Sequence, residues 1–192
     1  DQVSRVFSHV VTKMTAQGTP HISTGVLGTQ EIMRGLTDYG RGDIAYQIAA
    51  NTTYPSWGFM VAHGATTIWE LWNGDTANPR MNSGNHIMLL GDLIIWYYQY
   101  LAGIRQAPDS QAYRHIVLRP YIADGLSHVN ASYRSPYGNI VSRWRIEGGR
   151  LHWQFTIPAN TTAEVYVPQA DGSYRQAHYG SGTYEVSAPA RQ

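Results

Sequence analysis

The sequence predicts a chain of two parts, a helical segment followed by an antiparallel β-sandwich, and three observations lead to this prediction. Apolar residues recur every three or four positions from the start of the chain to about Arg105. After Pro108 the period changes to two, which is typical of half-buried strands. Turn-forming residues then separate six or more short alternating runs, as in a β-sandwich. We therefore place the boundary between the two parts near residues 104–112.

Three stretches of the first part have helical spacing. A first helix is indicated by Val3, Val6, Phe7, Val10, Val11 and Met14. A second begins at Gly42-Asp43, with Asp43 as its cap, and has a stripe of Ile44, Ala45, Ile48 and Ala49. A third contains Ile87, Leu90, Ile94, Tyr98 and Leu101, widened by Met88, Leu89, Ile95 and Trp96. So wide a stripe predicts that the third helix is packed on most of its sides.

The second part alternates along two clear runs. Leu151, Trp153, Phe155 and Ile157 alternate with polar residues, and Ile140, Trp144 and Ile146 alternate with Val141, Arg143 and Arg145. Turn signals stand at residues 135–138, 147–149, 158–160, 171–172 and 179–182. These runs and turns predict strands that are buried on one face.

Composition excludes several classes of protein. The chain of 192 residues is 43% hydrophobic and 14% charged with a net charge of +1, which favours globular domains with a core. It has no basic block for nucleic acid, and no apolar run of the roughly 20 residues that span a membrane. The absence of cysteine excludes disulfides and cysteine-ligated metals, and leaves cytoplasm and periplasm both open.

The stretch GATTIWELWNG, from Gly64 to Gly74, places Glu70 among tryptophans. Aromatic rings beside a carboxylate exclude water, and this loss of hydration raises its pKa toward the range that suits general acid or base catalysis. The other interpretation is a loop carboxylate bonded to backbone amides beside two core tryptophans. Both interpretations stay open at this point. Glu31, Asp38 and Asp43 are weaker candidates, because the start of a helix explains an acid at Glu31 and at Asp43.

A histidine and several aromatic residues are the other candidates for a site. His86 ends the stretch MNSGNH before the third helix, which Asn82 or Ser83 would cap. We expect His86 in the first turn of that helix, with its ring toward whatever lies over the helix start. It either binds a sugar hydroxyl or is a satisfied structural histidine. Trp57, Trp69, Trp72 and Tyr54 offer a stacking surface or pack in the core. The connections His21–Thr29 and Thr52–Phe59 are interpreted as pocket walls.

We expect neither a cofactor nor a metal. No second histidine stands three or four positions after His86, as a zinc-binding helix would require. The glycines of Thr24–Gly28 follow no strand of a βαβ unit and lack the lysine of a phosphate-binding loop.

Four segments together resemble the C-terminal third of bacterial α-L-rhamnosidases of glycoside hydrolase family 78. They are HISTGVLGT, YPSWGFMVAHGATTIWELWNG, MNSGNHIMLLGDLIIWYYQYLAGI and FTIPANTTAEVYVP. The resemblance implies that residues 1–106 are the last helices of an (α/α)6 catalytic barrel and that residues 107–192 are a C-terminal β-sandwich. The first residues have neither a starting Met nor a signal pattern, so we expect a C-terminal part of a longer protein.

The resemblance also implies site residues and partners. Family members invert the anomeric centre, and Glu70 matches their general base, His86 a rhamnose contact, and Trp69 and Trp57 aromatic pocket walls. The family's general acid lies in an upstream Asp-rich motif that is absent here, so we expect this chain alone to be inactive. Expected partners are a rhamnose-containing glycoside or polysaccharide, the missing N-terminal part of the protein, and further copies in a homo-oligomer.

Two positions depart from the family pattern. Gly84 stands where an aromatic residue is usual, and Leu71 where an arginine is usual. Because of these departures, one alternative is a hydrolase or lyase with the same type of barrel that acts on another sugar. The other alternative is a carbohydrate-binding or accessory module without catalysis.

Overall fold

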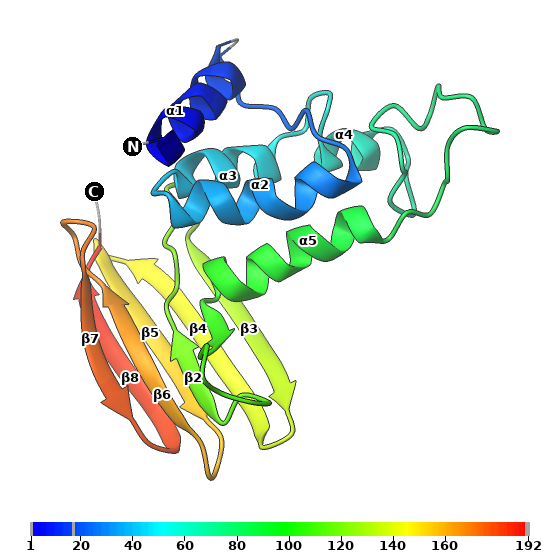
Figure 1. Cartoon of the computed structure of the whole chain (residues 1–192). Helices are drawn as coiled ribbons and strands as arrows, with labels where there is room; N and C mark the ends of the chain where they lie inside the picture. Colours follow the sequence, from blue (N-terminus) through cyan, green and yellow to red (C-terminus); the bar gives the residue numbers. More distant parts are fainter. Residues whose placement is uncertain (1, 17, 191–192) are drawn as a thin grey trace. The chain divides into compact units, whose positions relative to one another are not determined.

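The computed structural model describes residues 2–16 and 18–190, without the side chain of Val26. The chain divides into two compact units, Asp1–Ile94 and Ile95–Gln192. The first unit is helical and the second contains two β-sheets (Figure 1). Helices followed by a β-sandwich are therefore confirmed as the order of the fold.

The helices of the first unit are α1 (Gln2–Thr15), α2 (Val26–Asp38), α3 (Gly42–Ala50), α4 (Trp57–Ala62) and α5 (Met88–Trp96), the last of which ends beyond Ile94. The predicted helices at the start of the chain, after Gly42 and after Ile87 are confirmed. α4 falls in a stretch that we expected to be a connection. Ser56 Oγ caps it by accepting a hydrogen bond from Phe59 N at 2.9 Å. Six residues are too few to give a periodic signal.

Three local expectations about these helices were wrong. Asp43 does not cap α3, because its carboxylate accepts two hydrogen bonds from the guanidinium of Arg41 (2.9 and 2.8 Å), and this lowers the pKa of Asp43. Asn82 and Ser83 do not cap α5, because their side chains accept hydrogen bonds from the backbone amides of Leu71 and Asn85 instead. α5 also begins two residues after His86, so this histidine is not in its first turn.

α5 is packed on part of its surface among the described residues. Leu89 and Leu93 are buried, but several large apolar side chains of α5 and its neighbours are exposed, namely Ile87, Met88, Ile94, Ile95, Tyr97 and Tyr98. The helix continues into a π-helical turn, η1 (Tyr97–Leu101), at the start of the second unit. Among the described residues the wide stripe therefore contains both buried and exposed apolar side chains.

The second unit is a sandwich of two four-stranded sheets with strand orders β1-β2-β6-β7 and β3-β4-β5-β8. The strands are β1 (Ile104–Gln106), β2 (His115–Leu118), β3 (His128–Ser135), β4 (Gly138–Glu147), β5 (Arg150–Ile157), β6 (Thr162–Pro168), β7 (Tyr174–Tyr179) and β8 (Gly182–Pro189). All five turn signals lie between consecutive strands. β2 and β6 pair in parallel, whereas the other neighbours are antiparallel as expected.

The period of two places one face of each central strand in the core. Trp144 of β4 and Trp153 and Phe155 of β5 are buried, together with residues of both sheets. The β4–β5 hairpin closes through Gly148 and Gly149 alone, with φ of +56° and +71°. Such a two-residue loop needs a left-handed backbone at both positions, which glycine adopts without strain.

A serine at a core position connects the sandwich to the segment after η1. Ser142, fully buried on β4, donates from Oγ to Ala102 O (2.7 Å) and accepts from Trp153 Nε1 (3.0 Å). Trp144 Nε1 donates to Leu101 O at 2.8 Å. The polar atoms at this point of the core therefore satisfy one another, as burial requires.

We predict that Ser142→Ala lowers the free energy of unfolding by about 2 kcal/mol or more, because it leaves the Trp153 N–H and the Ala102 carbonyl without their shared partner. Urea unfolding followed by tryptophan fluorescence measures this loss. Ser132→Ala, at an exposed position of β3, is the control and should change stability little. Equal stability of the two variants would contradict the role given to Ser142.

The α1 helix buries none of its residues, and a cavity of about 630 Å³ lies between α1 and α2. Its apolar lining is made by Val3, Val6, Phe7, Val10, Ile32 and Leu36. Surface of this kind favours association in water.

We therefore predict that the chain self-associates, with an apparent mass in light scattering that rises with concentration. Val6→Lys should weaken the association, because Val6 lines the cavity and is 60% exposed. Ser8→Lys adds the same charge to α1 at an exposed position away from that lining and should leave it unchanged. A monodisperse monomer at high concentration would contradict the prediction.

Candidate active site

The candidate site is built by two stretches of the long connection between α4 and α5, which Figure 1 shows as an irregular loop. Glu70 N donates to Ser83 O at 2.9 Å, and Ser83 N donates back to Glu70 Oε2 at 2.9 Å. Leu71 N donates to Asn82 Oδ1 at 3.0 Å. The stretch that contains Glu70 is thus bound directly to the stretch that precedes His86.

The same pairing continues as far as His86. His86 N donates to Ile68 O at 2.6 Å, and Thr67 Oγ1 donates to Gly84 O. Five hydrogen bonds therefore join residues 67–71 to residues 82–86. Two motifs that were singled out separately in the sequence form a single structural unit, which we call the paired loops.

The Glu70 carboxylate is anchored through one of its two oxygens. Oε2 accepts the hydrogen bond from Ser83 N, and the side chain is half-buried. Among the described residues no donor contacts Oε1. A bond to a backbone amide was expected if Glu70 were only a structural loop carboxylate, but this bond involves only one of its two oxygens. The contact fixes the orientation of the group and leaves one oxygen able to accept a proton.

His86 has unused hydrogen-bonding capacity. Its Nε2 is buried and has no hydrogen-bond partner among the described residues. A buried imidazole nitrogen without a partner costs free energy, so such atoms are rare unless a ligand or another protein group satisfies them. The paired loops therefore carry a Glu70 carboxylate with one oxygen free of hydrogen bonds and a His86 nitrogen without a partner among the described residues.

The tryptophans take different positions around the paired loops. Trp57 is only 5% exposed and its Nε1 donates to Leu89 O at 3.2 Å. Its ring meets Trp72 edge to face, at 5.4 Å and 85°, and Trp72 Nε1 donates to Thr24 O at 3.0 Å. Trp57 and Trp72 thus connect the stretch 21–29, α4, the paired loops and α5 within the first unit.

Trp69 lies beside a glycine and is half-buried. A Cβ atom added to Gly74 would come within 2.6 Å of Trp69 Cγ, so the indole ring packs directly on the backbone of the Asn-Gly turn. The glycine after Asn73 is therefore required by this close approach.

The acidic residues of the helices have structural partners. Glu31 lies in the second turn of α2 rather than the first, and is paired with Arg34 at 3.5 Å. Sequence reasoning missed Asp92 of α5, which is 8% exposed and lies 3.8 Å from Arg34. Burial raises the pKa of Asp92, while Arg34 acts in the opposite direction. The available signal was that Asp92 is the single charged residue in an otherwise apolar helix.

The described residues contain neither a membrane-spanning helix nor a cluster of side chains that could bind a metal. No helix among them is long and apolar enough to cross a membrane. No group of three histidine, aspartate or glutamate side chains in the described ranges lies close enough together to hold a metal ion.

Two family models together match most of the chain. The family model for the bacterial alpha-L-rhamnosidase 6 hairpin glycosidase domain matches residues 1–101, and that for the bacterial alpha-L-rhamnosidase C-terminal domain matches residues 103–181. The chain belongs to the bacterial α-L-rhamnosidase family. The resemblance seen in the four sequence segments is thereby confirmed.

Relatives support the same family. An alpha-L-rhamnosidase of Streptomyces avermitilis is 35% identical over 181 residues, which are 88% of this chain and 17% of the relative. One from Formosa agariphila is 38% identical over 153 residues, covering 77% of this chain and 16% of the relative. The chain thus spans about a sixth of the length of these relatives.

Solved structures agree with the fold. The Streptomyces avermitilis alpha-L-rhamnosidase complexed with L-rhamnose superposes with a TM-score of 0.85 at 33% identity, covering 94% of this chain and 19% of that one. The alpha-L-rhamnosidase from Dictyoglumus thermophilum has a TM-score of 0.85 at 28% identity, covering 94% and 22%.

We predict that Gly74→Ala lowers the free energy of unfolding by about 1 to 3 kcal/mol, because the new Cβ overlaps the Trp69 ring. Gly84→Ala is the matched control in the same connection, since a Cβ there meets nothing within 4 Å. It should be neutral or slightly stabilising through the unfolded chain. Urea unfolding with tryptophan emission separates the two, and a neutral Gly74→Ala would contradict the packing described.

Proposed function

We propose that this chain is the C-terminal part of an inverting α-L-rhamnosidase that releases terminal α-L-rhamnose from glycosides or polysaccharides, with Glu70 as the general base. The observation that supports it is the pairing of the loops. They hold a carboxylate with one unused oxygen and a histidine with an unused nitrogen on directly bonded segments. Residues 1–106 would belong to the catalytic barrel and residues 107–192 to the C-terminal sandwich.

The proposed chemistry divides between two carboxyl groups. In an inverting glycosidase one carboxylic acid protonates the departing glycosidic oxygen, while a carboxylate removes a proton from the attacking water on the opposite face of the sugar. The two groups stand roughly 6.5–9.5 Å apart so that the water fits between them. Glu70 would take the water proton on Oε1, while Ser83 N holds Oε2 in place. The acid would come from a preceding part of the protein, so the chain alone is proposed to be inactive.

The other proposed roles concern binding. The Nε2 atom of His86 would gain its missing hydrogen bond from a rhamnose hydroxyl. Trp69 and Trp57 would form aromatic walls, with Trp57 acting from its buried position beside Trp72. A 6-deoxy sugar presents a methyl group and C–H faces that indole rings contact favourably. The structural relative that was solved with L-rhamnose supports this choice of sugar.

We predict that Glu70→Gln, tested in a full-length rhamnosidase that contains these 192 residues, lowers kcat on an aryl rhamnoside by about 10²-fold or more. Glutamine retains an oxygen that can accept the hydrogen bond from Ser83 N but cannot remove a proton from water. The melting temperature should therefore stay close to that of the parent protein, and the rate should fall at every substrate concentration.

Glu31→Gln is the control, because it removes the same charge from an exposed side chain whose pair with Arg34 lies at the surface. Its turnover should match that of the parent. Near-normal turnover of Glu70→Gln would exclude Glu70 as the base. If rhamnose binds but no variant and no parent protein turns over the aryl rhamnoside, the accessory-module alternative holds instead.

A further inference from the structure

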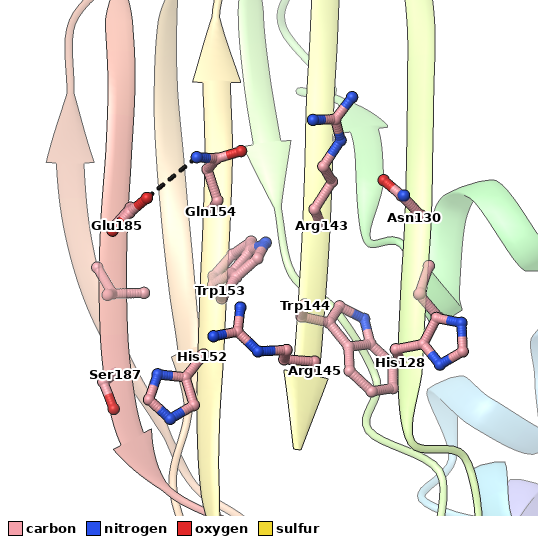
Figure 2. A pocket seen from close by; sticks show the side chains of 12 residues that line it. His128, Asn130, Arg143, Trp144, Arg145, His152, Trp153, Gln154, Glu185 and Ser187 are labelled. Carbon is pink, nitrogen blue, oxygen red and sulfur yellow. Dashed lines mark hydrogen bonds between the residues drawn. The ribbon is translucent and has the colours of Figure 1, made fainter. Parts of the chain in front are cut away.

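The outer face of the sheet β3-β4-β5-β8 has a hollow that none of the roles proposed above uses. The hollow has a volume of about 550 Å³. Figure 2 shows its lining, which comes from all four strands and is rich in arginine, histidine and amide side chains. The lining lies entirely within the second unit.

Strand register orders the polar side chains into two rungs. One rung runs across the sheet as His128, Arg145, His152 and Ser187, and the next as Asn130, Arg143, Gln154 and Glu185. Neighbouring strands lie about 4.8 Å apart, so each rung is about 14 Å wide, and the two rungs stand about 7 Å apart along the strands. A platform of this size suits a chain of sugar units better than a single small molecule.

Along each strand the rung residues alternate with core residues, so the tryptophans of β4 and β5 point into the core and not to the outer face. Trp144 and Trp153 lie between the rung residues of β4 and β5, and both are buried with exposures of 2% and 1%. Stacking on indole rings, which is a common means of binding neutral sugars, is therefore not offered by these strands. Recognition at this face must come from hydrogen bonds and charge.

The charge of the platform is positive. Arg143, Arg145 and Arg150, which donates to Ser187 Oγ at 3.2 Å, carry three guanidinium groups, against the carboxylates of Glu185 and Glu147. Glu185 accepts a hydrogen bond from Gln154 at 3.0 Å at the β8 edge (Figure 2). Arg145 is bonded to Glu147 at 3.0 Å but remains 62% exposed, and no described side chain bonds to Arg143. His128 and His152 add ring nitrogens that can take part in hydrogen bonds.

We propose that this platform binds an acidic oligosaccharide, a chain of sugar units that carry carboxylate groups. A guanidinium matches a carboxylate with two parallel hydrogen bonds, and amide, imidazole and hydroxyl groups match sugar hydroxyls. Two arginines on one strand face would hold the carboxylates, while Asn130, Gln154 and Ser187 would contact the hydroxyls. The choice of a saccharide over an acidic peptide rests on membership of a glycosidase family, and does not depend on Glu70 acting as a base.

The test titrates the full 192-residue chain with tetragalacturonate, with maltotetraose as the neutral ligand and tetraglutamate as the acidic peptide. Binding is read by calorimetry and by backbone amide chemical shifts. Tetragalacturonate should bind and shift amides at residues 128–130, 143–145, 152–154 and 185–187. The affinity should fall as NaCl rises from about 50 to 500 mM, because exposed charges are screened over that range. Maltotetraose should not bind measurably.

The double variant Arg143→Gln/Arg145→Gln should weaken tetragalacturonate binding by at least about tenfold, from the loss of two charge-assisted contacts. Arg114→Gln/Arg175→Gln removes the same total charge from exposed positions away from the platform and should bind like the parent chain. If both double variants lost the same affinity for tetragalacturonate, the loss would follow from net charge alone and the proposal would be overturned. Binding of tetraglutamate as tight as that of tetragalacturonate, or amide shifts confined to other strands, would overturn it as well. Binding that persists in Glu70→Gln would show that this site is independent of the proposed catalytic role.

Discussion

The candidate site depends on the backbone pairing between residues 67–71 and 82–86. Neither stretch belongs to a helix or strand, so nothing within either one would hold a side chain in a fixed direction. The reciprocal bonds between Glu70 and Ser83 do so by using the main chain of one loop to orient the carboxylate of the other. His86, bonded through its amide to Ile68, is positioned by the same pairing. A carboxylate and an imidazole ring are thereby held by irregular backbone, whose polar groups must find hydrogen-bond partners nearby.

The paired loops are in turn supported by aromatic packing. The edge-to-face contact of Trp57 and Trp72 and their bonds to Leu89 O and Thr24 O connect the loop to elements on both sides of it in the sequence. Gly74 allows Trp69 to lie directly against the turn. Trp57 and Trp72 hold elements together through these contacts, and in our proposal Trp57 and Trp69 are also the aromatic walls of the sugar site. The family resemblance gave Trp57 and Trp69 the same role, as pocket walls, and gave Trp72 none.

Much of the fold could be predicted because the signals were local. The spacing of Val3 to Met14 and the alternation of Leu151 to Ile157 fix helix and strand, and Gly148-Gly149 fixes the hairpin between β4 and β5. Predictions failed where a side chain had a choice of partner. Asp43 bonds to Arg41 rather than capping α3, and Asn82 bonds to Leu71 rather than capping α5. α4 escaped prediction because its capping serine and six residues give no period. The roles of Glu70, His86, Trp57 and Trp69 were suggested by a family resemblance and stay predictions.

The sequence by itself determined the type and order of the elements, the turns between them and membership of the rhamnosidase family, because period, turn chemistry and motif are properties of neighbouring residues. Only the tertiary structure decided that Ser83 bonds to Glu70, that Ser142 connects Trp153 to Ala102, and that eight polar residues from four strands form two rungs on one sheet face. The hydrogen bonds of Ser142 join residues that are 11 and 40 positions apart in the sequence. All these pairings follow from strand register and loop closure, which depend on the packing of the whole unit rather than on any local pattern.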